Sequence, residues 1–201
     1  MKKIIFATTN ENKIREVKMM MEDFDIELIP MDEAGVKQEI EETGTTFVDN
    51  ALIKAQTVCE ITGEIALADD SGLEVDYLDG APGVYSARFL GENTSYDKKN
   101  NYIIEKLEGV KGKDRSARFV CAMALAYPDG SYDTCYGTIE GLIAYEQKGK
   151  NGFGYDPIVY VPEFEMTTGE MDPRLKNSIS HRGKALTQMK EIIRRKIINK
   201  Q

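Results

Sequence analysis

The stretch ALADDSGLEVD, residues 66–76, places two aspartates within a run of apolar residues. Ile65 and the residues up to Ala68 predict a buried strand, and we expect this strand to end at Asp70. In α/β proteins, ligands bind beyond the ends of the core strands. A carboxylate directly after a buried strand is costly unless it is paired or binds a metal. Asp69 and Asp70 are therefore candidate functional residues.

The rest of the chain surrounds this strand with alternating strand and helix patterns. Apolar spacing predicts strands at 2–7 and 26–29, helices at 13–21, 46–62 and 96–107, a hairpin of long strands around a turn at 128–130, and a C-terminal helix after Ser180. Thr46 and Asp49 are spaced like a capping box at the start of the second helix. Helical crossovers come early and the hairpin comes late, so we predict an α/β fold with a mixed sheet.

Composition limits the classes of protein that this chain can belong to. Its 201 residues, 41% of them hydrophobic, suffice for one domain or one domain with two lobes. A net charge of −8 opposes a broad nucleic-acid or membrane surface. The three cysteines show no CxxC spacing, which favours buried thiols over disulfides or zinc. With no signal peptide or membrane span in the pattern, we expect a soluble cytoplasmic protein.

Polar residues near the N-terminus have the chemistry of a phosphate site. Thr8, Thr9, Asn10 and Lys13 place hydroxyls, an amide and an ammonium near a predicted helix N-terminus, which attracts anions. The glycines of a P-loop are missing. Taken alone, the segment fits a capped helix with a surface lysine at least as well.

Carboxylates gather in two predicted loops. Glu41 and Glu42 join Asp69 and Asp70 as a set of hard oxygen ligands, which suits Mg²⁺ bound together with phosphates. Acidic pairs are often only solvated loop residues, and for Glu41 and Glu42 alone that interpretation is favoured.

The C-terminal third adds a basic segment and two aromatic residues on a loop. His181, the single histidine, lies near Lys176 and Arg182 in an otherwise acidic protein. A lone histidine is usually structural. Phe153 and Tyr155 lie between glycines, and a loop aromatic can stack on a base. Together these features indicate a nucleotide ligand.

Five blocks of sequence resemble the inosine triphosphate pyrophosphatase family, whose members hydrolyse deaminated purine nucleoside triphosphates. They are ATTNENK (7–13), EETGTTFVDNALIKA (41–55), ADDSGLEVDYLDGAPGVYSARF (68–89), GFGYDPIVYVP (152–162) and KNSISHRGKA (176–185). The resemblance implies a single domain over residues 1–201, with a long twisted mixed sheet, helices in two lobes, an active site in the cleft between them, and a homodimer.

The resemblance also implies roles for individual residues. Asp70 is the expected general base and, with Glu42, the expected Mg²⁺ ligand, although Glu41 remains an alternative to Glu42. The residues expected to bind substrate are Thr8, Thr9, Asn10 and Lys13 on the triphosphate, Ser71 beside them, Phe153, Gly154, Tyr155 and Asp156 as the base-stacking wall, and Lys176, His181 and Arg182 on the purine. Pro173 and Arg174 depart from the family pattern, which leaves the local path before Lys176 open.

The implied reaction is hydrolysis of ITP, dITP or XTP to the monophosphate and pyrophosphate, which removes these nucleotides from the pool. A purine 6-carbonyl can accept a hydrogen bond from Arg182, whereas the amino group of adenine cannot. Two alternatives stay open: a Maf-like pyrophosphatase for pyrimidine nucleotides, and a nucleotide-binding sensor without turnover.

Overall fold

The computed structural model describes residues 2–199. Within them, the strands are β1 (Lys2–Phe6), β2 (Ile26–Pro30), β3 (Ala66–Val75), β4 (Ser116–Ala126), β5 (Tyr132–Ile143), β6 (Val159–Val161) and β7 (Met166–Thr167). The helices are α1 (Glu11–Met20), α2 (Phe47–Thr62), α3 (Tyr96–Lys106), α4 (Pro173–Ile179) and α5 (His181–Ile193), and α5 continues into a π-helical turn, Arg194–Ile198. Short 3₁₀ turns occupy Asp76–Leu78, Gly83–Tyr85, Gly112–Arg115, Asp156–Ile158 and Pro162–Phe164.

The described strands form one mixed sheet in the order β2-β1-β3-β4-β5-β6-β7. β1 pairs in parallel with β2 and β3, whereas β6 pairs antiparallel with β5 and β7. The expected α/β fold with a mixed sheet is thus confirmed. By its internal contacts the chain divides into two compact units. Unit 1 is Met1–Asp70, Cys121–Gly137 and Arg182–Gln201, and unit 2 is Ser71–Val120 and Thr138–His181.

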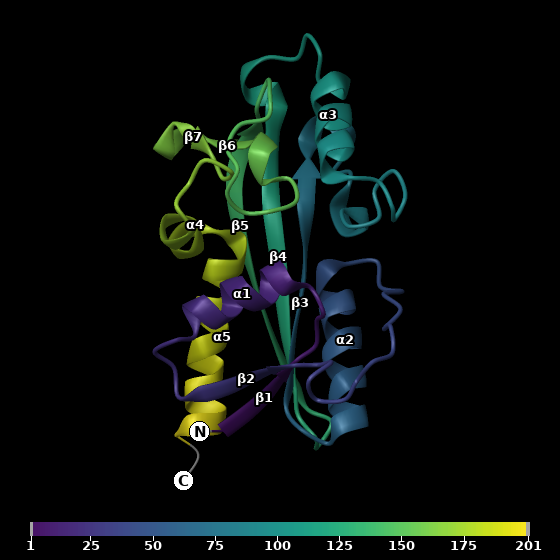
Figure 1. The fold of residues 1–201 in the computed structure, drawn as a ribbon, viewed down its shortest axis with the longest axis vertical. Coiled ribbons are helices and arrows are strands. Elements are labelled where there is room, and N and C mark those ends of the chain that lie inside the picture. Colours follow the sequence, from purple (N-terminus) through teal and green to yellow (C-terminus); the bar gives the residue numbers. More distant parts are fainter. Residues whose placement is uncertain (1, 200–201) are drawn as a thin grey trace. The chain divides into compact units, whose positions relative to one another are not determined.

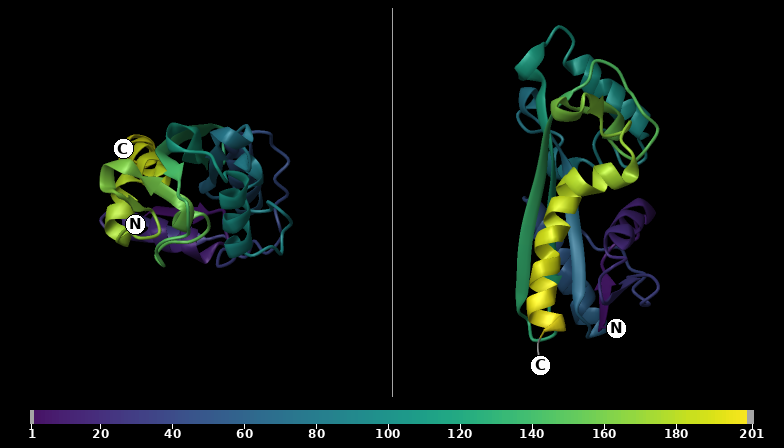
Figure 2. Two further views of the ribbon diagram at one scale, coloured as in Figure 1. Left: turned by 90° about the horizontal axis from the view of Figure 1, so that it is seen from above. Right: turned by 90° about the vertical axis from the view of Figure 1, so that its left-hand side faces the viewer.

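Unit 1 has its core between the strands and α1 and α5. Ile4 and Phe6 of β1, Leu67 of β3, and Leu186 and Met189 of α5 are among its buried members. Figure 1 shows α5 and α2 on opposite sides of the strands of this unit. The second view in Figure 2 shows α5 lying along the strands, and the side-chain amide of Gln188 donates to the Tyr136 carbonyl of β5 there. Helices thus cover both faces of these strands.

Unit 2 has a separate core. Leu73 and Val75 of β3, Ile103 of α3, and Ile143 and Ile158 are buried in it. The glycine-containing loop at residues 151–155 leads through the 3₁₀ turn Asp156–Ile158 into β6. Asp172 caps α4 and Pro173 opens it, so the segment before Lys176 is helical. Proline suits the first turn of a helix because its missing N–H would have no helical partner there.

The prediction that the core strand ends at Asp70 is wrong, because β3 continues to Val75. Ser71 and Gly72 do not terminate it, since Leu73 and Val75 return to buried positions and the strand keeps its neighbours in the sheet. Asp69 and Asp70 therefore lie in the middle of a ten-residue strand. Successive side chains of a strand point to opposite faces of the sheet, so the two carboxylates have different surroundings.

The cysteines are as predicted. All three lie within the described residues and all are free thiols, with Cys59 and Cys121 buried and Cys135 partly buried. Among the described residues, no helix combines the length and the apolar character that crossing a membrane requires.

Candidate functional site

Asp69 is fully buried and its Oδ2 atom binds two cations. Lys13 Nζ of α1 lies 3.1 Å from this atom, and Arg182 of α5 contacts it through Nε at 3.2 Å and Nη2 at 3.1 Å. Arg182 Nη1 also donates to Glu16 Oε2 at 2.7 Å. β3, α1 and α5 are thus connected by a buried charge network, the Asp69 network, made up of Lys13, Glu16, Asp69 and Arg182.

The Asp69 network determines the charge of its aspartate. Burial by itself would raise the pKa of Asp69, but the nearby charges of Lys13 and Arg182 outweigh it and hold the pKa well below its usual range. Burial likewise opposes the charge of Arg182, yet Asp69 and Glu16 raise its pKa above the ordinary value. Asp69 is therefore a charged anchor at neutral pH, which makes it poorly suited to accept a proton there.

We expect Asp69→Asn to lower the free energy of unfolding by about 3–5 kcal/mol at neutral pH, because it leaves the buried Arg182 and Lys13 without their shared carboxylate. Since the folded-state pKa of Asp69 lies below its unfolded value of about 3.9, the charge stabilises the fold above that pH. This stabilisation is lost as the pH falls toward the folded-state pKa. Urea unfolding is measured between about pH 5 and pH 2. The free energy of unfolding should fall less steeply with decreasing pH in the variant than in the parent.

The matched control is Glu191→Gln, which removes an exposed carboxylate paired with Arg194, the first residue of the π-helical turn after α5. Exposed pairs contribute little to stability, so this variant should unfold like the parent. Equal stability of Asp69→Asn and the parent would contradict the role of Asp69 as an anchor.

Asp70 has a different environment from Asp69. Lys54 Nζ of α2 lies 3.7 Å from Asp70 Oδ1 and 2.5 Å from Glu42 Oε1. Asn50 Nδ2 donates to Asp70 Oδ2 at 3.1 Å. Burial raises the pKa of Asp70 above its ordinary value despite the opposing charges of Lys54 and Lys13, and the charge of Glu42 adds to the increase. A carboxyl with a raised pKa can accept a proton, so of the two aspartates Asp70 is the candidate base.

Asn50 also positions the loop that carries Glu42. It is fully buried, and its Oδ1 atom accepts a hydrogen bond from the Gly44 N–H at 2.8 Å. A Cβ atom on Gly44 would lie 2.6 Å from this oxygen, so only glycine permits the approach. The predicted capping box of Thr46 and Asp49 is confirmed and starts α2 directly after the loop. One amide side chain thus joins the Glu42 loop to Asp70.

The segment before α1 forms the expected helix start. Asn10 is the N-cap and accepts hydrogen bonds from the N–H groups of Asn12 and Lys13, and Thr8 Oγ1 accepts one from Asn10 N–H. Thr9 is exposed beside them. The hydroxyls therefore lie at the positive end of α1, where an anion is favoured.

Asp156 organises the predicted base-binding loop in unit 2. Its Oδ2 atom accepts from Phe153 N–H at 2.7 Å and from Lys176 Nζ at 2.6 Å, and its Oδ1 atom accepts from Thr168 Oγ1 at 2.9 Å. Lys176 Nζ also lies 5.1 Å from the centre of the Phe153 ring. A Cβ atom on Gly152 would fall 2.0 Å from Asp156 Oδ2. The buried carboxylate thus fixes the backbone and the charge next to Phe153.

Of the other predicted residues of unit 2, Tyr155 and His181 are buried, whereas Gly154 and Ser71 are partly exposed like Phe153. The Tyr155 ring is buried, its hydroxyl donates to the Ser86 carbonyl at 2.8 Å, and it meets Tyr96 edge to face. His181 is buried and stacks on Phe119 with 4.8 Å between ring centres. Gly154 adopts a positive φ of 68°, and Ser71 is partly exposed directly after Asp70. Phe153 is therefore the aromatic side chain that this loop presents.

Sequence reasoning missed four residues of these networks, namely Glu16, Asn50, Lys54 and Thr168. Three of them carried a usable signal. Glu16 follows Lys13 by three residues and so shares its helix face, and Lys54 follows Asn50 by four on a face that also bears Ala51 and Ala55. On α2, polar side chains that share a face with small apolar residues are expected to be buried and therefore to have partners. Nothing local indicated Thr168.

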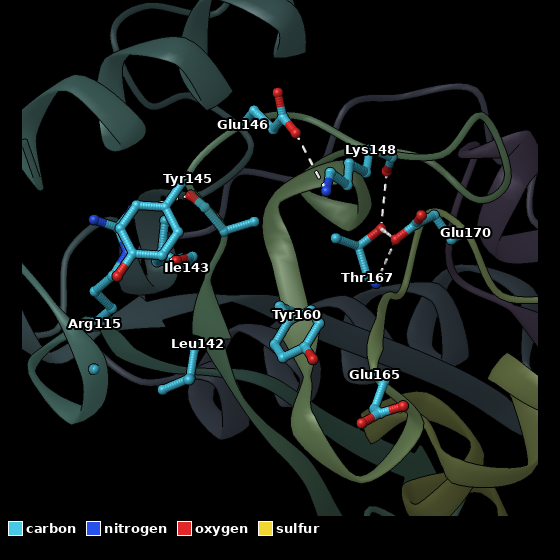
Figure 3. Close-up of a pocket in the computed structure, with 12 residues that line it drawn as sticks. Arg115, Leu142, Ile143, Tyr145, Glu146, Lys148, Tyr160, Glu165, Thr167 and Glu170 are labelled. Atoms are coloured by element: carbon cyan, nitrogen blue, oxygen red, sulfur yellow. Dashed lines mark hydrogen bonds and ion pairs between the residues drawn. The ribbon is translucent and has the colours of Figure 1, made fainter.

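A pocket of about 400 Å³ in unit 2 contains none of the predicted residues (Figure 3). Arg115 lies against the Tyr145 ring, 4.2 Å from its centre, and donates to the main-chain carbonyls of Leu107, Ile143 and Ala144. Its guanidinium therefore stabilises the surrounding turns.

Taken over the described part of the chain, no group of three or more histidine, cysteine, aspartate or glutamate side chains is arranged to hold a metal ion. Any metal held by Glu42 and Asp70 would need further oxygen ligands from water or from a bound ligand.

The fold and these networks define an α/β protein whose third strand carries two adjacent buried aspartates with pKa values shifted in opposite directions. The chain matches the Ham1 family over residues 4–192 and belongs to that family. It is 48% identical over 199 residues to the dITP/XTP pyrophosphatase of Desulforamulus reducens, covering 99% of both chains. It is 47% identical to the enzyme of the same name from Bacillus licheniformis, covering 96% of this chain and 98% of that one.

Solved structures agree with the family assignment. A HAM1 protein from Coxiella burnetii matches with a TM-score of 0.89 and 45% identity, over 97% of this chain and 100% of that one. The Ham1 protein of Staphylococcus aureus matches with a TM-score of 0.86 and 38% identity, over 96% and 98%. The resemblance drawn from the five sequence blocks is thus confirmed.

Proposed function

We propose that this protein is a Mg²⁺-dependent pyrophosphatase that hydrolyses deaminated purine nucleoside triphosphates to the monophosphate and pyrophosphate. The observation that carries the proposal is the contrast in β3, where Asp69 is held as an anchor and Asp70 has a raised pKa beside Glu42 and Lys54. The relatives named dITP/XTP pyrophosphatase support this substrate class over pyrimidine nucleotides.

Glu42 and Asp70 fit a magnesium ion. Their oxygens converge on one point, because a single ammonium, Lys54 Nζ, lies within 4 Å of both. Glu41 is exposed, whereas Glu42 makes this contact, so we assign the ligand role to Glu42. When bound, Mg²⁺ neutralises charge that develops on the phosphates and orients the pyrophosphate leaving group.

The chain's own residues would act on both ends of the nucleotide. Lys13 and the α1 N-terminus with Thr8, Thr9 and Asn10 supply cationic and polar groups for the phosphates, and Ser71 adds a hydroxyl. Phe153 offers a ring face to the base, with Lys176 held over it by Asp156. Asp70 accepts a proton from the water that attacks the α-phosphorus. His181 and Arg182 are proposed to select the purine.

The proposal is tested by measuring pyrophosphate release from ITP, dITP, XTP, ATP, GTP, CTP and UTP under identical conditions. We expect kcat/KM for ITP, dITP and XTP to exceed that for the other nucleotides. Preference for CTP or UTP would favour the Maf-like alternative. Tight nucleotide binding without product would favour the non-catalytic sensor. A homodimer, which rests on the family resemblance, and a cytoplasmic location, which rests on the free thiols of the three cysteines, are further parts of the proposal.

Phe153→Ala should weaken the binding of ITP and of ATP by the same amount, about 1–3 kcal/mol, because every purine has a face on which the ring can stack. The ratio of kcat/KM for the two substrates should then stay near the parent value. A loss confined to ITP would contradict the role of Phe153 as a general stacking surface.

Arg182→Lys separates base selection from the anchoring of Asp69, because lysine keeps the positive charge and loses the planar fork of donors. If Arg182 donates to the purine 6-carbonyl, kcat/KM for ITP should fall at least tenfold more than that for ATP. An equal fall for both substrates would assign Arg182 to the Asp69 network alone.

A further inference from the structure

We propose that Lys54 occupies the position of the divalent cation whenever the nucleotide is absent, so that metal and nucleotide bind the protein together. This inference rests on the proposed function, since it concerns the same two carboxylates. Lys54 Nζ lies 2.5 Å from Glu42 Oε1 and 3.7 Å from Asp70 Oδ1. A metal ion that contacted both oxygens would need the space that this ammonium now fills.

The surroundings of Lys54 make this position stable in the nucleotide-free protein. Its side chain is only 11% exposed, and it extends from the middle of α2, near the small residues Ala51 and Ala55. A buried ammonium is costly unless anions surround it. Glu42 and Asp70 supply those anions, and the ammonium in turn reduces the repulsion between the two carboxylates. The pair of carboxylates therefore has a resident counter-ion.

A divalent cation must compete with this resident counter-ion. Two cations cannot share the same pair of oxygens without strong repulsion, so metal binding requires the ammonium to leave. In the buried surroundings of α2 it needs another anion, and the phosphates of a nucleotide would supply one. Displacement of the Lys54 ammonium is therefore favourable when metal and nucleotide bind together, and it is unfavourable when the metal binds alone.

The consequence is positive coupling between the two ligands. By linkage, a nucleotide that draws Lys54 away raises the affinity for the metal, and the metal raises the affinity for the nucleotide by the same factor. Free metal should bind the parent protein weakly. Removing the charge of Lys54 should remove the competition and allow the metal to bind without a nucleotide.

The test measures Mn²⁺ binding to the nucleotide-free protein, by the loss of the free Mn²⁺ signal in electron paramagnetic resonance. Lys54→Met should bind Mn²⁺ at least tenfold more tightly than the parent. Lys18→Met is the charge-matched control, because Lys18 is an exposed lysine at the end of α1, and it should bind Mn²⁺ like the parent. The double variant Lys54→Met with Glu42→Gln should lose the gain, because it lacks one of the two ligands.

Lys54→Met leaves two carboxylates close together, so its folding is checked by thermal melting. If it does not fold, Lys54→Gln replaces it, since this amide can still donate to Glu42. Mn²⁺ binding to the variant that is no tighter than to the parent would overturn the proposal. A gain that survives Glu42→Gln would overturn it too, because the metal would then lie elsewhere. The measurement needs no turnover, so a protein that shows the gain but does not hydrolyse ITP would refute the proposed function and leave this inference intact.

Discussion

Asp70→Asn will lower kcat for ITP by about a hundredfold to ten-thousandfold, the range expected when a positioned general base is lost. The amide has nearly the same shape as the carboxylate and can still contact Lys54, but it cannot accept the proton of the attacking water. The structure favours Asp70 over Asp69 for this role because Lys13 and Arg182 hold the Asp69 carboxylate in its charged form. Single-turnover kinetics with saturating ITP measures the chemical step directly.

A binding measurement and a control variant accompany this test. Nucleotide affinity, determined by calorimetry without a divalent cation, should change far less than kcat, because Lys13 and Phe153 remain. Asp76→Asn serves as the matched control, since Asp76 follows the same strand but pairs with the partly exposed Arg118. It should retain the parent rate. Turnover of ITP by Asp70→Asn at close to that rate would exclude Asp70 as the base.

Removal of divalent cations will abolish turnover, and added Mg²⁺ will restore it. The reason is electrostatic, because the carboxylates of Glu42 and Asp70 would otherwise face the negative charge of the triphosphate. The measurement is pyrophosphate release after dialysis against a chelator, followed by titration with Mg²⁺. Undiminished turnover in the presence of the chelator would rule out the metal.

Glu41 and Glu42 form a matched pair for locating the metal ligand. Glu42→Gln should raise the Mg²⁺ concentration needed for half-maximal activity at least tenfold, because Glu42 shares a cation with Asp70. Glu41→Gln should leave that concentration unchanged, since the side chain of Glu41 is exposed. The reverse result would move the ligand role to Glu41.

Much of the fold followed from local patterns. The helix starts at Asn10 and Thr46 were predictable because N-capping depends on residues within one turn. The end of β3 was not predictable in this way. Ser71 and Gly72 weaken a strand locally, but pairing within the sheet and the burial of Leu73 and Val75 carry it further. Sheet pairing joins residues distant in sequence, so a local pattern does not contain it.

The order of amino acids is enough to predict the α/β class, the family and the kinds of side chain that the site uses, namely carboxylates, lysines, an arginine and a loop phenylalanine in recognisable blocks. The tertiary structure decided which of them act on one another. It paired Asp69 with Arg182, which lies 113 residues away, and placed Lys54 between Glu42 and Asp70. Two adjacent aspartates thereby acquired opposite pKa shifts. The physical reason is that a pKa depends on burial and on charges within a few ångströms, and chain folding alone sets those distances.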